Sequence, residues 1–448
     1  MEQLLHYTWK HKLFPLRELR TTDGRKVEVL SPGIHNTNAG PDFIEAKIKI
    51  DDNVWVGNVE IHTKSSDWFR HHHDKDKAYE SIILHVASQI DCQLHYPNGQ
   101  EIPQLQLDTP PYVQENYTDL SRNDHHPRCK TVVEKLPQLM IHNWMTSLTL
   151  ERFEERTKQI LARRETLDKD WENTLFVTIA RNFGFGLNGD AFETWASSIP
   201  MSAVAKHRDN LFQIEAIFFG QAGLLNTDLQ DEYYATLQKE YHYLHQKFSL
   251  TPISPSAWKF LRLRPQNFPY IRIAQLAMLY HEQRLNLSQL INATNLNEVS
   301  NLLITHTSDY WKNHYCFGGQ ASSPRENRLS KSSIELIVIN SIAPTLFAYG
   351  KYKSDQHLRD RAFSLWEQIR AENNRITREW AAAGILCENA ADSQALIQLT
   401  RHYCQPHDCL RCQFGYEFIR RTPDFLREED INRIRYNDTN QTDNKDAN

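Results

Sequence analysis

The sequence predicts an α+β protein, with an N-terminal mixed β-sheet flanked by helices, followed by a large all-α region. Within the first 110 residues, short apolar runs alternate with polar residues, which is typical of strands that bury one face. Beyond residue 128 the apolar spacing is helical almost to the end. We therefore predict a sheet domain at residues 1–109, a linker at 110–128, a helical domain at 129–436 and a disordered tail at 437–448.

The sheet domain is expected to contain a helix, three strands, a second helix and a fourth strand. Residues 2–14 form the apolar-rich opening helix, and residues 66–80 carry aromatic and histidine side chains at roughly helical spacing. The strands are expected at residues 26–30, 43–50, 54–63 and 81–87. Consecutive strands joined by turns, followed by a helical crossover, imply a mixed sheet with helices packed on it.

The rest of the chain is predicted to be helical after a linker marked by Pro110–Pro111. The clearest helices are expected at residues 136–164, 211–224, 231–248, 271–284 and 358–383. The longest apolar run, residues 334–349, includes a glutamate, an asparagine and a proline. It is also shorter than the ~20 residues that cross a bilayer, so we interpret it as a buried helix and expect no membrane association.

Composition and charge exclude several classes of protein. Of the 448 residues, 40% are hydrophobic and 24% are charged, which is typical of a globular protein and excludes a mostly disordered chain. The net charge of −5 restricts nucleic-acid binding to a local patch. The N-terminus lacks the apolar stretch of a signal peptide, and seven cysteines suit reduced thiols better than a disulfide framework. We therefore expect a cytoplasmic protein; its oligomeric state and protein partners are not predicted.

The segment at residues 39–79 carries the strongest chemical signal. Asp42 opens one predicted strand, and Glu60 and His62 lie in the next strand. Residues two apart on a strand share a face, so Glu60, His62 and Lys64 project together. Glu60 together with Asp42 would provide oxygen ligands for a hard divalent cation such as Mg²⁺ or Mn²⁺. Such a cation polarises a phosphoryl oxygen and lowers the pKa of bound water.

These residues resemble the signature of the PD-(D/E)XK nucleases, and the predicted order of elements matches the core of that fold. The resemblance implies a metal-dependent phosphodiesterase that cuts DNA or RNA by in-line hydrolysis. It also implies that Asp42 and Glu60 hold the metal, with the Ile61 carbonyl as a further ligand.

The same resemblance assigns roles to three residues outside the signature. Glu2, on the opening helix, is placed like the extra acidic residue of many members. His72 and Tyr79 lie where members often present a polar residue to the site or to the phosphate backbone.

One position departs from the family pattern, because His62 stands where these nucleases have a lysine. A neutral imidazole can accept a proton near pH 7. Alternatively, Lys64 supplies the cation, or the site is degenerate and the protein only binds nucleic acid or another protein. A zinc hydrolase that uses His62, His72 and Asp42 is a weaker alternative.

Structural interpretations of the same residues stay open beside the functional ones. Asp42 follows Gly-Pro and would also suit a turn, while Glu60 and His62 would also suit an exposed strand face. His85 alternates with apolar neighbours and is expected to be a partly buried structural histidine.

The whole chain also resembles an uncharacterised bacterial family known as a domain of unknown function. The stretches NAGPDF, GNVEIH and SSDW and the late cysteine cluster carry this resemblance. It implies a shared architecture and supplies no activity.

A cysteine cluster near the C-terminus predicts a structural metal site. Cys404, Cys409 and Cys412 form a C-x4-C-x2-C pattern, which nearly completes a tetrahedral shell for zinc or the ligand set of an iron–sulfur cluster. Such clusters are similar to those near the C-terminus of some nucleases and DNA glycosylases. The candidates for the fourth ligand are Cys387, which an iron–sulfur cluster would favour, His402 and His407. Reduced thiols without a metal are the alternative.

One basic patch is a candidate nucleic-acid surface. Between residues 259 and 272 there are four basic residues and no acidic one, namely Lys259, Arg262, Arg264 and Arg272. Aromatic residues are interleaved with them, and such a combination can follow phosphates and stack on bases. A second patch, at residues 10–26, has a local excess of basic residues. Both patches would also suit ordinary helix capping and ion pairing.

Overall fold

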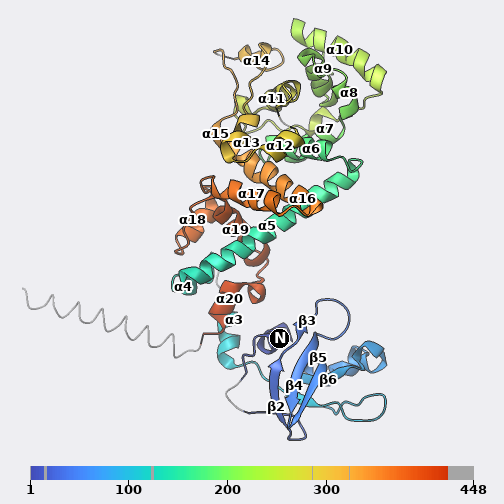
Figure 1. Cartoon of the computed structure of the whole chain (residues 1–448), viewed down its shortest axis with the longest axis vertical. Coiled ribbons are helices and arrows are strands. Elements are labelled where there is room, and N and C mark those ends of the chain that lie inside the picture. Colours follow the sequence, from blue (N-terminus) through green and yellow to red (C-terminus); the bar gives the residue numbers. More distant parts are fainter. Residues whose placement is uncertain (1, 15–17, 123–125, 285, 322, 422–448) are drawn as a thin grey trace, which may run out of the picture. The chain divides into compact units, whose positions relative to one another are not determined.

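A computed structural model describes residues 2–14, 18–122, 126–284, 286–321 and 323–421 of the protein (Figure 1). The chain forms two compact units. Unit 1 comprises Met1–Pro137, Ala382–Ile385 and Thr400–Asn448, and unit 2 comprises Gln138–Ala381 and Leu386–Leu399. The predicted α+β class is confirmed, since unit 1 holds the sheet and unit 2 is helical apart from one short hairpin. The predicted tail at residues 437–448 lies outside the described part of the chain.

Unit 1 begins with one helix and the strands of a mixed sheet. The elements up to the first crossover are α1 (Glu2–Lys10), β1 (Leu19–Arg20), β2 (Lys26–Ser31), β3 (Ile34–His35), β4 (Phe43–Ile50) and β5 (Asn53–Lys64). The crossover consists of α2 (Asp67–Arg70) and two 3-10 turns, η1 (His73–Lys75) and η2 (Lys77–Tyr79). It leads into β6 (Ile82–Gln89) and β7 (Gln104–Gln106).

The sheet has the mixed topology that the order of elements predicts. The strand order is β1-β2-β4-β5-β6-β7, and β3 pairs with β4 off this path. The pairs up to β4–β5 are antiparallel, whereas β5–β6 and β6–β7 are parallel. The parallel pair requires a crossover, and here α2, η1 and η2 provide it. In this order β5 is an inner strand, with the antiparallel β4 on one side and the parallel β6 on the other (Figure 1).

The two faces of β5 bury different residues. Val59 and Ile61 belong to a core cluster that Leu5 and Trp9 of α1 complete. Glu60 and His62 alternate with them, so both project to the opposite face. Next to the crossover, a smaller cluster gathers Trp68 and Tyr79 with residues of the following strand and loop. Polar side chains on the second face therefore end up under a cover rather than in open solvent.

A β-bulge in β4 and a glycine in β5 shape this part of the sheet. The register of β4 against β5 shifts between Phe43 and Ala46, and Glu45 in the bulge has a φ of 58°. Bulges of this kind redirect nearby side chains and are common beside functional sites. Gly57 faces β6 so closely that an added Cβ would lie 2.4 Å from Ile83 Cγ2. No other residue fits there without moving β6.

The end of the chain folds with unit 1. The elements concerned are α3 (Pro111–Arg122), α4 (Lys130–Val133), the π-helical turn η6 (Thr400–Cys404), the 3-10 turn η7 (Cys409–Arg411) and α20 (Gln413–Ile419). Helix α3 occupies most of the predicted linker and packs against α20. The side chain of Asn116 on α3 donates to the carbonyl oxygens of Ile419 and Arg421, at 3.0 and 2.8 Å. Residues that the sequence assigned to a linker and to a separate helical domain thus pack together.

Unit 2 is built from helices around a large aromatic and aliphatic core. Its helices as far as α11 are α5 (Gln138–Thr166), α6 (Trp171–Phe183), α7 (Gly189–Ser197), α8 (Met201–Ala205), α9 (Leu211–Gln221), α10 (Glu232–Phe248), η3 (Pro255–Ala257), η4 (Pro265–Asn267) and α11 (Pro269–His281). The remaining elements are α12 (Leu287–Asn292), α13 (Leu296–Leu302), α14 (Tyr310–Asn313), β8 (His314–Cys316), β9 (Gly319–Gln320), α15 (Lys331–Ile337), η5 (Val338–Ile342), α16 (Ala343–Lys353), α17 (Gln356–Glu367), α18 (Arg375–Ala381) and α19 (Ala390–Leu399).

The apolar run at residues 334–349 lies inside a continuous helical stretch of unit 2. Within the described residues, Lys331–Lys353 is the one helix that is long and apolar enough to cross a membrane. Of the most apolar 18-residue stretch in this helix, 72% is buried inside the protein. Such burial is typical of a core helix and agrees with the interpretation of this run as a buried helix.

Candidate functional site

The β4–β5 pairing places the two predicted metal-binding acids side by side. Phe43 pairs with Val59, so Asp42, directly before β4, lies opposite Glu60. The backbone N–H of Asp42 donates to Glu60 Oε2 at 3.1 Å, and the backbone N–H of Ile61 donates to Asp42 Oδ2 at 2.9 Å. Glu60 is 4% exposed, and burial followed by the nearby charge of Asp42 raises its pKa. Two carboxylates from neighbouring strands therefore converge on one point.

A histidine of the opening helix reaches the same point. His6 Nε2 lies 3.4 Å from Asp42 Oδ2 and 3.4 Å from the carbonyl oxygen of Ile61. Burial alone would lower the pKa of His6, but the hydrogen bond and the charge of Asp42 outweigh it and raise the pKa. Glu2, one turn earlier on α1, adds its charge to this effect. Glu2 therefore acts on the site through His6, a residue that the sequence did not point to.

His62 is buried in a group of imidazoles. It is 1% exposed, its Nδ1 lies 2.9 Å from Nε2 of the fully buried His85, and its Nε2 lies 3.2 Å from His71 Nδ1. Burial, and then the charge that neighbouring imidazoles would carry, lowers the pKa of His62 to about 2. Burial likewise lowers the pKa of His85 to about 4. Both rings are therefore neutral at pH 7, and His85 orients His62.

The crossover delivers two of its three consecutive histidines to the site. The predicted helix over residues 66–80 is not continuous, because His72 adopts a left-handed conformation with φ of 62°. Helix α2 ends before this residue, and His71 and His73 on either side of it reach the site with their ring nitrogens, although His71 is exposed like His72. The prediction that His72 approaches the site is therefore replaced by His71 and His73. Helical spacing alone could not reveal this, since it assumes an unbroken helix.

His73 connects the carboxylates to the aromatic cover. Its Nε2 lies 3.1 Å from Glu60 Oε1, and its ring stacks on Tyr79 with centroids 3.9 Å apart. Trp68 meets both rings edge-on. Burial, and then the charge of Glu60, raises the pKa of Tyr79 to about 12. Tyr79 is therefore a neutral group beside the site, as its predicted position suggested.

Three imidazoles of this group have the spacing of a metal site. One nitrogen from each of His62, His71 and His73 lies within 4.8 Å of the others. Glu60 Oε1 is 3.6 Å from His62 Nε2, so a carboxylate oxygen borders the same space. Neutral imidazole and carboxylate are the ligands of many catalytic transition-metal centres. We call His62, His71 and His73 the imidazole triad, and we call the triad with His6, Asp42 and Glu60 the carboxylate–histidine site. Lys64, at the end of β5, is exposed.

A family model described as "Protein of unknown function (DUF2851)" matches residues 2–375 of this chain. The chain belongs to the DUF2851 family. Neither a curated protein nor a solved structure matches it. The matched range contains the whole carboxylate–histidine site of this DUF2851 protein and ends before the late cysteine cluster.

The basic patch predicted in unit 2 of this DUF2851 protein is only partly on the surface. Lys259, Arg262 and Arg264 are exposed, as a phosphate contact requires. Arg272 is 5% exposed and donates to Gln275 Oε1 and Asn267 Oδ1 at 2.9 and 2.7 Å. Its burial withdraws Arg272 from any surface that a nucleic acid could touch. The aromatic residues of the patch pack on one another and on the core, so they are not free to stack on bases.

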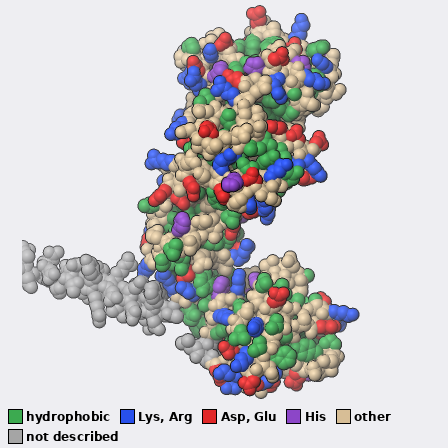
Figure 2. Space-filling view, in the orientation of Figure 1, with side chains coloured by type: hydrophobic (Ala, Val, Ile, Leu, Met, Phe, Trp, Pro, Cys, Tyr) green, Lys and Arg blue, Asp and Glu red, His purple; other side chains and the backbone are tan. Residues whose placement is uncertain are grey.

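Three basic residues of the other predicted patch, at residues 10–26, form ion pairs with acidic neighbours. Arg20 and Lys26 both pair with Glu18, and Arg25 pairs with Asp23. On the face shown in Figure 2, basic and acidic side chains are interspersed over both units. On this face, charge therefore does not single out a nucleic-acid surface by itself.

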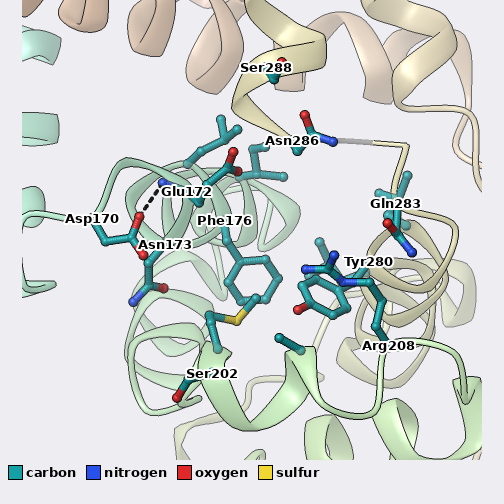
Figure 3. A pocket seen from close by; sticks show the side chains of 16 residues that line it. Asp170, Glu172, Asn173, Phe176, Ser202, Arg208, Tyr280, Gln283, Asn286 and Ser288 are labelled. Atoms are coloured by element: carbon teal, nitrogen blue, oxygen red, sulfur yellow. Dashed lines mark hydrogen bonds between the residues drawn. The ribbon is translucent and has the colours of Figure 1, made fainter.

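Unit 2 contains a cavity of about 630 Å³ between α6, α8, α11 and α12 (Figure 3). Two of its polar groups form hydrogen bonds that stabilise the surrounding helices. Asp170 caps α6, and Glu172 accepts the backbone N–H of Leu287 with both carboxylate oxygens at 3.1 Å. The guanidinium of Arg208 lies over the ring of Tyr280. The cavity is large enough for a small ligand, but it lacks the convergent titratable groups of the carboxylate–histidine site.

Proposed function

We propose that this protein is a metal-dependent phosphodiesterase that hydrolyses DNA or RNA at the carboxylate–histidine site. One observation carries the proposal. Asp42 and Glu60, from neighbouring strands, converge on the same side as three imidazoles whose ligand atoms lie within 4.8 Å of one another. The mixed topology around β5 and the position of α1 are those that the resemblance to PD-(D/E)XK nucleases implies, and they support this proposal.

The donor atoms divide into a hard set and a softer set. Asp42, Glu60 and the Ile61 carbonyl provide oxygen, and the imidazole triad provides nitrogen. Oxygen ligands suit Mg²⁺ and Mn²⁺, while added imidazoles favour Mn²⁺, Fe²⁺ or Zn²⁺. We therefore expect Mn²⁺ or another transition metal to support activity better than Mg²⁺. When bound, such a cation polarises a phosphoryl oxygen and lowers the pKa of a water ligand.

In this proposal, His62 does not act as the cation that the lysine of the PD-(D/E)XK nucleases provides. With a pKa of about 2, its ring is neutral at pH 7 and a weak base. A neutral ring whose second nitrogen bonds another group is well suited to hold a metal, because that bond orients the ligand. The 2.9 Å contact between His62 Nδ1 and His85 Nε2 provides this support. We assign His62 to ligation and His85 to positioning.

Cations beside the site would bind the phosphates of the substrate. Lys64 at the end of β5 and Lys75 and Lys77 in the crossover are exposed. Phosphate contacts of this kind supply affinity without reading sequence. Because the whole protein carries a net charge of −5, binding would depend on this local group and weaken as salt increases.

The second candidate function is a module that binds nucleic acid or protein without cutting it. It is favoured by the neutral His62 at the lysine position, since the site then lacks the cation that the PD-(D/E)XK nucleases place there. Lys64 is two residues further along β5 and exposed, and on this alternative it contacts a phosphate only as a ligand.

A cleavage assay distinguishes the two functions. The full chain would be incubated with single-stranded, duplex and branched DNA and with RNA, in Mn²⁺, Mg²⁺, Zn²⁺ or Co²⁺. A generic phosphodiester, bis(p-nitrophenyl) phosphate, would report chemistry that does not depend on nucleic-acid recognition. We expect cleavage with Mn²⁺ that Glu60→Gln reduces at least 100-fold, because the substitution removes a charged ligand that borders the triad.

The matched control is Glu28→Gln, which changes an exposed glutamate on β2 of the same sheet. It should leave cleavage unchanged. Equal activity of Glu60→Gln and the wild type would contradict the proposed site. If no substrate is cut with any of the four metals although metal and nucleic acid both bind, the binding module is the better description.

A further inference from the structure

Four cysteines lie at the ends of four short elements that pack together in unit 1. Cys129 is the N-cap of α4, Cys404 ends η6, Cys409 begins η7, and Cys412 is the N-cap of α20. Helix α20 packs on both α4 and η7, and η7 packs on η6. Cys129 precedes unit 2 in the sequence and the other three follow it, so their proximity depends on the tertiary fold.

Hydrogen bonds hold this arrangement closely. The backbone N–H of Cys412 donates to the carbonyl oxygen of Cys409 at 3.2 Å. Arg128, next to Cys129, donates from Nη1 to the carbonyl oxygen of Cys404 at 3.0 Å. Gly415 approaches Cys409 so closely that an added Cβ would lie 2.1 Å from its carbonyl oxygen. The backbones that carry the four thiols are therefore fixed relative to one another.

Two of the thiols, those of Cys129 and Cys404, have other cysteines as electrostatic neighbours. Burial, and then Cys412, Cys404 and Cys409, raise the pKa of the Cys129 thiol. Burial, and then Cys412 and Cys409, raise the pKa of Cys404. Such mutual effects require the sulfurs to be near neighbours. Cys129 and Cys412 are buried, and Cys404 and Cys409 are half-buried.

We propose that Cys129, Cys404, Cys409 and Cys412 form a four-thiolate metal centre in unit 1. An all-cysteine set takes a thiophilic metal, either one zinc ion or an iron–sulfur cluster. A closed set of four protein ligands suits a structural role. The centre would join the segment before unit 2 to the segment after it, across 275 positions of sequence. It is separate from the carboxylate–histidine site, and neither proposal depends on the other.

This assignment replaces the fourth ligand that sequence spacing suggested. Cys387 belongs to unit 2, and after burial the influence on its thiol is Asp392 rather than another cysteine. His407 Nε2 lies 2.6 Å from Arg128 Nη2 and is exposed. Cys129 has the burial and the thiol neighbours that these two candidates lack.

The spacing of the sulfurs bears on which metal is bound. A single zinc with bonds of about 2.3 Å draws four sulfurs to within about 4 Å of one another. Among the described residues, the imidazole triad is the one group with three or more ligand atoms within 4.8 Å of one another, so the sulfurs are spaced more widely. Zinc would have to draw them inward, whereas a cluster of iron and sulfide spans a wider set.

The test measures metal on the full chain purified without oxygen. Zinc, iron and acid-labile sulfide would be determined per chain, before and after reconstitution with Zn²⁺ or with Fe²⁺ and sulfide. Zinc without sulfide that protects the cysteines identifies a mononuclear centre, and comparable iron and sulfide identify a cluster. Thiol alkylation of the wild type, with and without removal of the metal, then shows by mass spectrometry which cysteines the metal protects.

The proposal predicts that metal protects the four assigned cysteines and leaves Cys387 reactive. Cys129→Ser should abolish the protection of Cys404, Cys409 and Cys412 by metal, whereas Cys387→Ser and Cys316→Ser should keep it. Alkylation of the wild type keeps the test decisive even if Cys129→Ser fails to fold. Failure of metal to protect the four cysteines after both reconstitutions would overturn the proposal. So would metal that protects Cys387 rather than Cys129.

Discussion

Replacing His85 with leucine tests whether the buried imidazoles are neutral. His85 is fully buried on β6, and Leu84 and Val86 beside it are apolar. Leucine therefore suits the site, and the substitution removes one imidazole together with its bond to His62. Loss of this hydrogen bond lowers the free energy of unfolding by an amount that hardly changes with pH. The change in pH dependence is thus the informative quantity.

The expected magnitude follows from the pKa of about 4 for His85 in the folded protein. Its unfolded value is about 6.5, so below pH 6.5 the unfolded chain binds a proton that the folded protein does not. The contribution of His85 to the free energy of unfolding is therefore fully present above pH 6.5, and it is lost as the pH falls towards 4. Each pH unit costs about 1.4 kcal/mol, so the loss between pH 6.5 and pH 5 is about 2 kcal/mol.

Neighbouring groups act in the opposite direction, so the comparison must be between variants. Glu60 and His6 have raised pKa values, so the contribution of each to the free energy of unfolding increases as the pH falls. The free energy of unfolding would be measured in urea at pH 7.5 and pH 5, with hydrogen exchange of β5 and β6 peptides reporting unit 1. Between pH 7.5 and pH 5, the free energy of unfolding of His85→Leu should fall by about 2 kcal/mol less than that of the wild type.

A control substitution and one outcome make this comparison decisive. His72→Asn changes an exposed histidine to a residue that tolerates its left-handed backbone, and its pH dependence should match that of the wild type. If His85→Leu and the wild type lose the same stability between pH 7.5 and pH 5, the account of a neutral, buried His85 is wrong.

Two further predictions concern stability elsewhere. Gly57→Ala should lower the free energy of unfolding of unit 1 by about 1–3 kcal/mol, because the new Cβ overlaps Ile83 and lies 2.9 Å from the Ser81 carbonyl oxygen. Urea denaturation checks this, and Gly189→Ala, whose Cβ meets ordinary contacts, should change stability little. Burial raises the pKa of Glu215 to about 7, so its contribution favours folding at low pH and falls by about 3 kcal/mol as pH rises from 4.5 to 7. Glu215→Gln should remove that decline in unit 2, and an unchanged decline would contradict the assignment.

Much of the sheet could be predicted because its determinants are local. The period-two pattern of residues 43–50 and 54–63 located β4 and β5 and placed Glu60 and His62 on one face. The spacing of Asp42 from Glu60 then sufficed to bring the two acids together, since adjacent antiparallel strands joined by a short turn have few possible registers.

What the sequence did not reveal depends on backbone exceptions and long-range contacts. His71 and His73 both contact the site because the intervening His72 has a positive φ, a conformation that helical spacing does not indicate. His6 contributes because α1 packs beside β5, which is a tertiary contact. Cys129 joins cysteines about 280 positions later, and no spacing rule for metal motifs extends that far.

The central claim is that carboxylate and imidazole groups of unit 1 form one metal centre. Pulsed electron paramagnetic resonance of the full chain loaded with Mn²⁺ tests it most directly, because coupling to nitrogen reports an imidazole ligand. We predict one tightly bound Mn²⁺ per chain with nitrogen coupling, which His73→Gln weakens and His72→Asn preserves. A Mn²⁺ signal without nitrogen coupling, or one that His73→Gln leaves unchanged, would contradict the account.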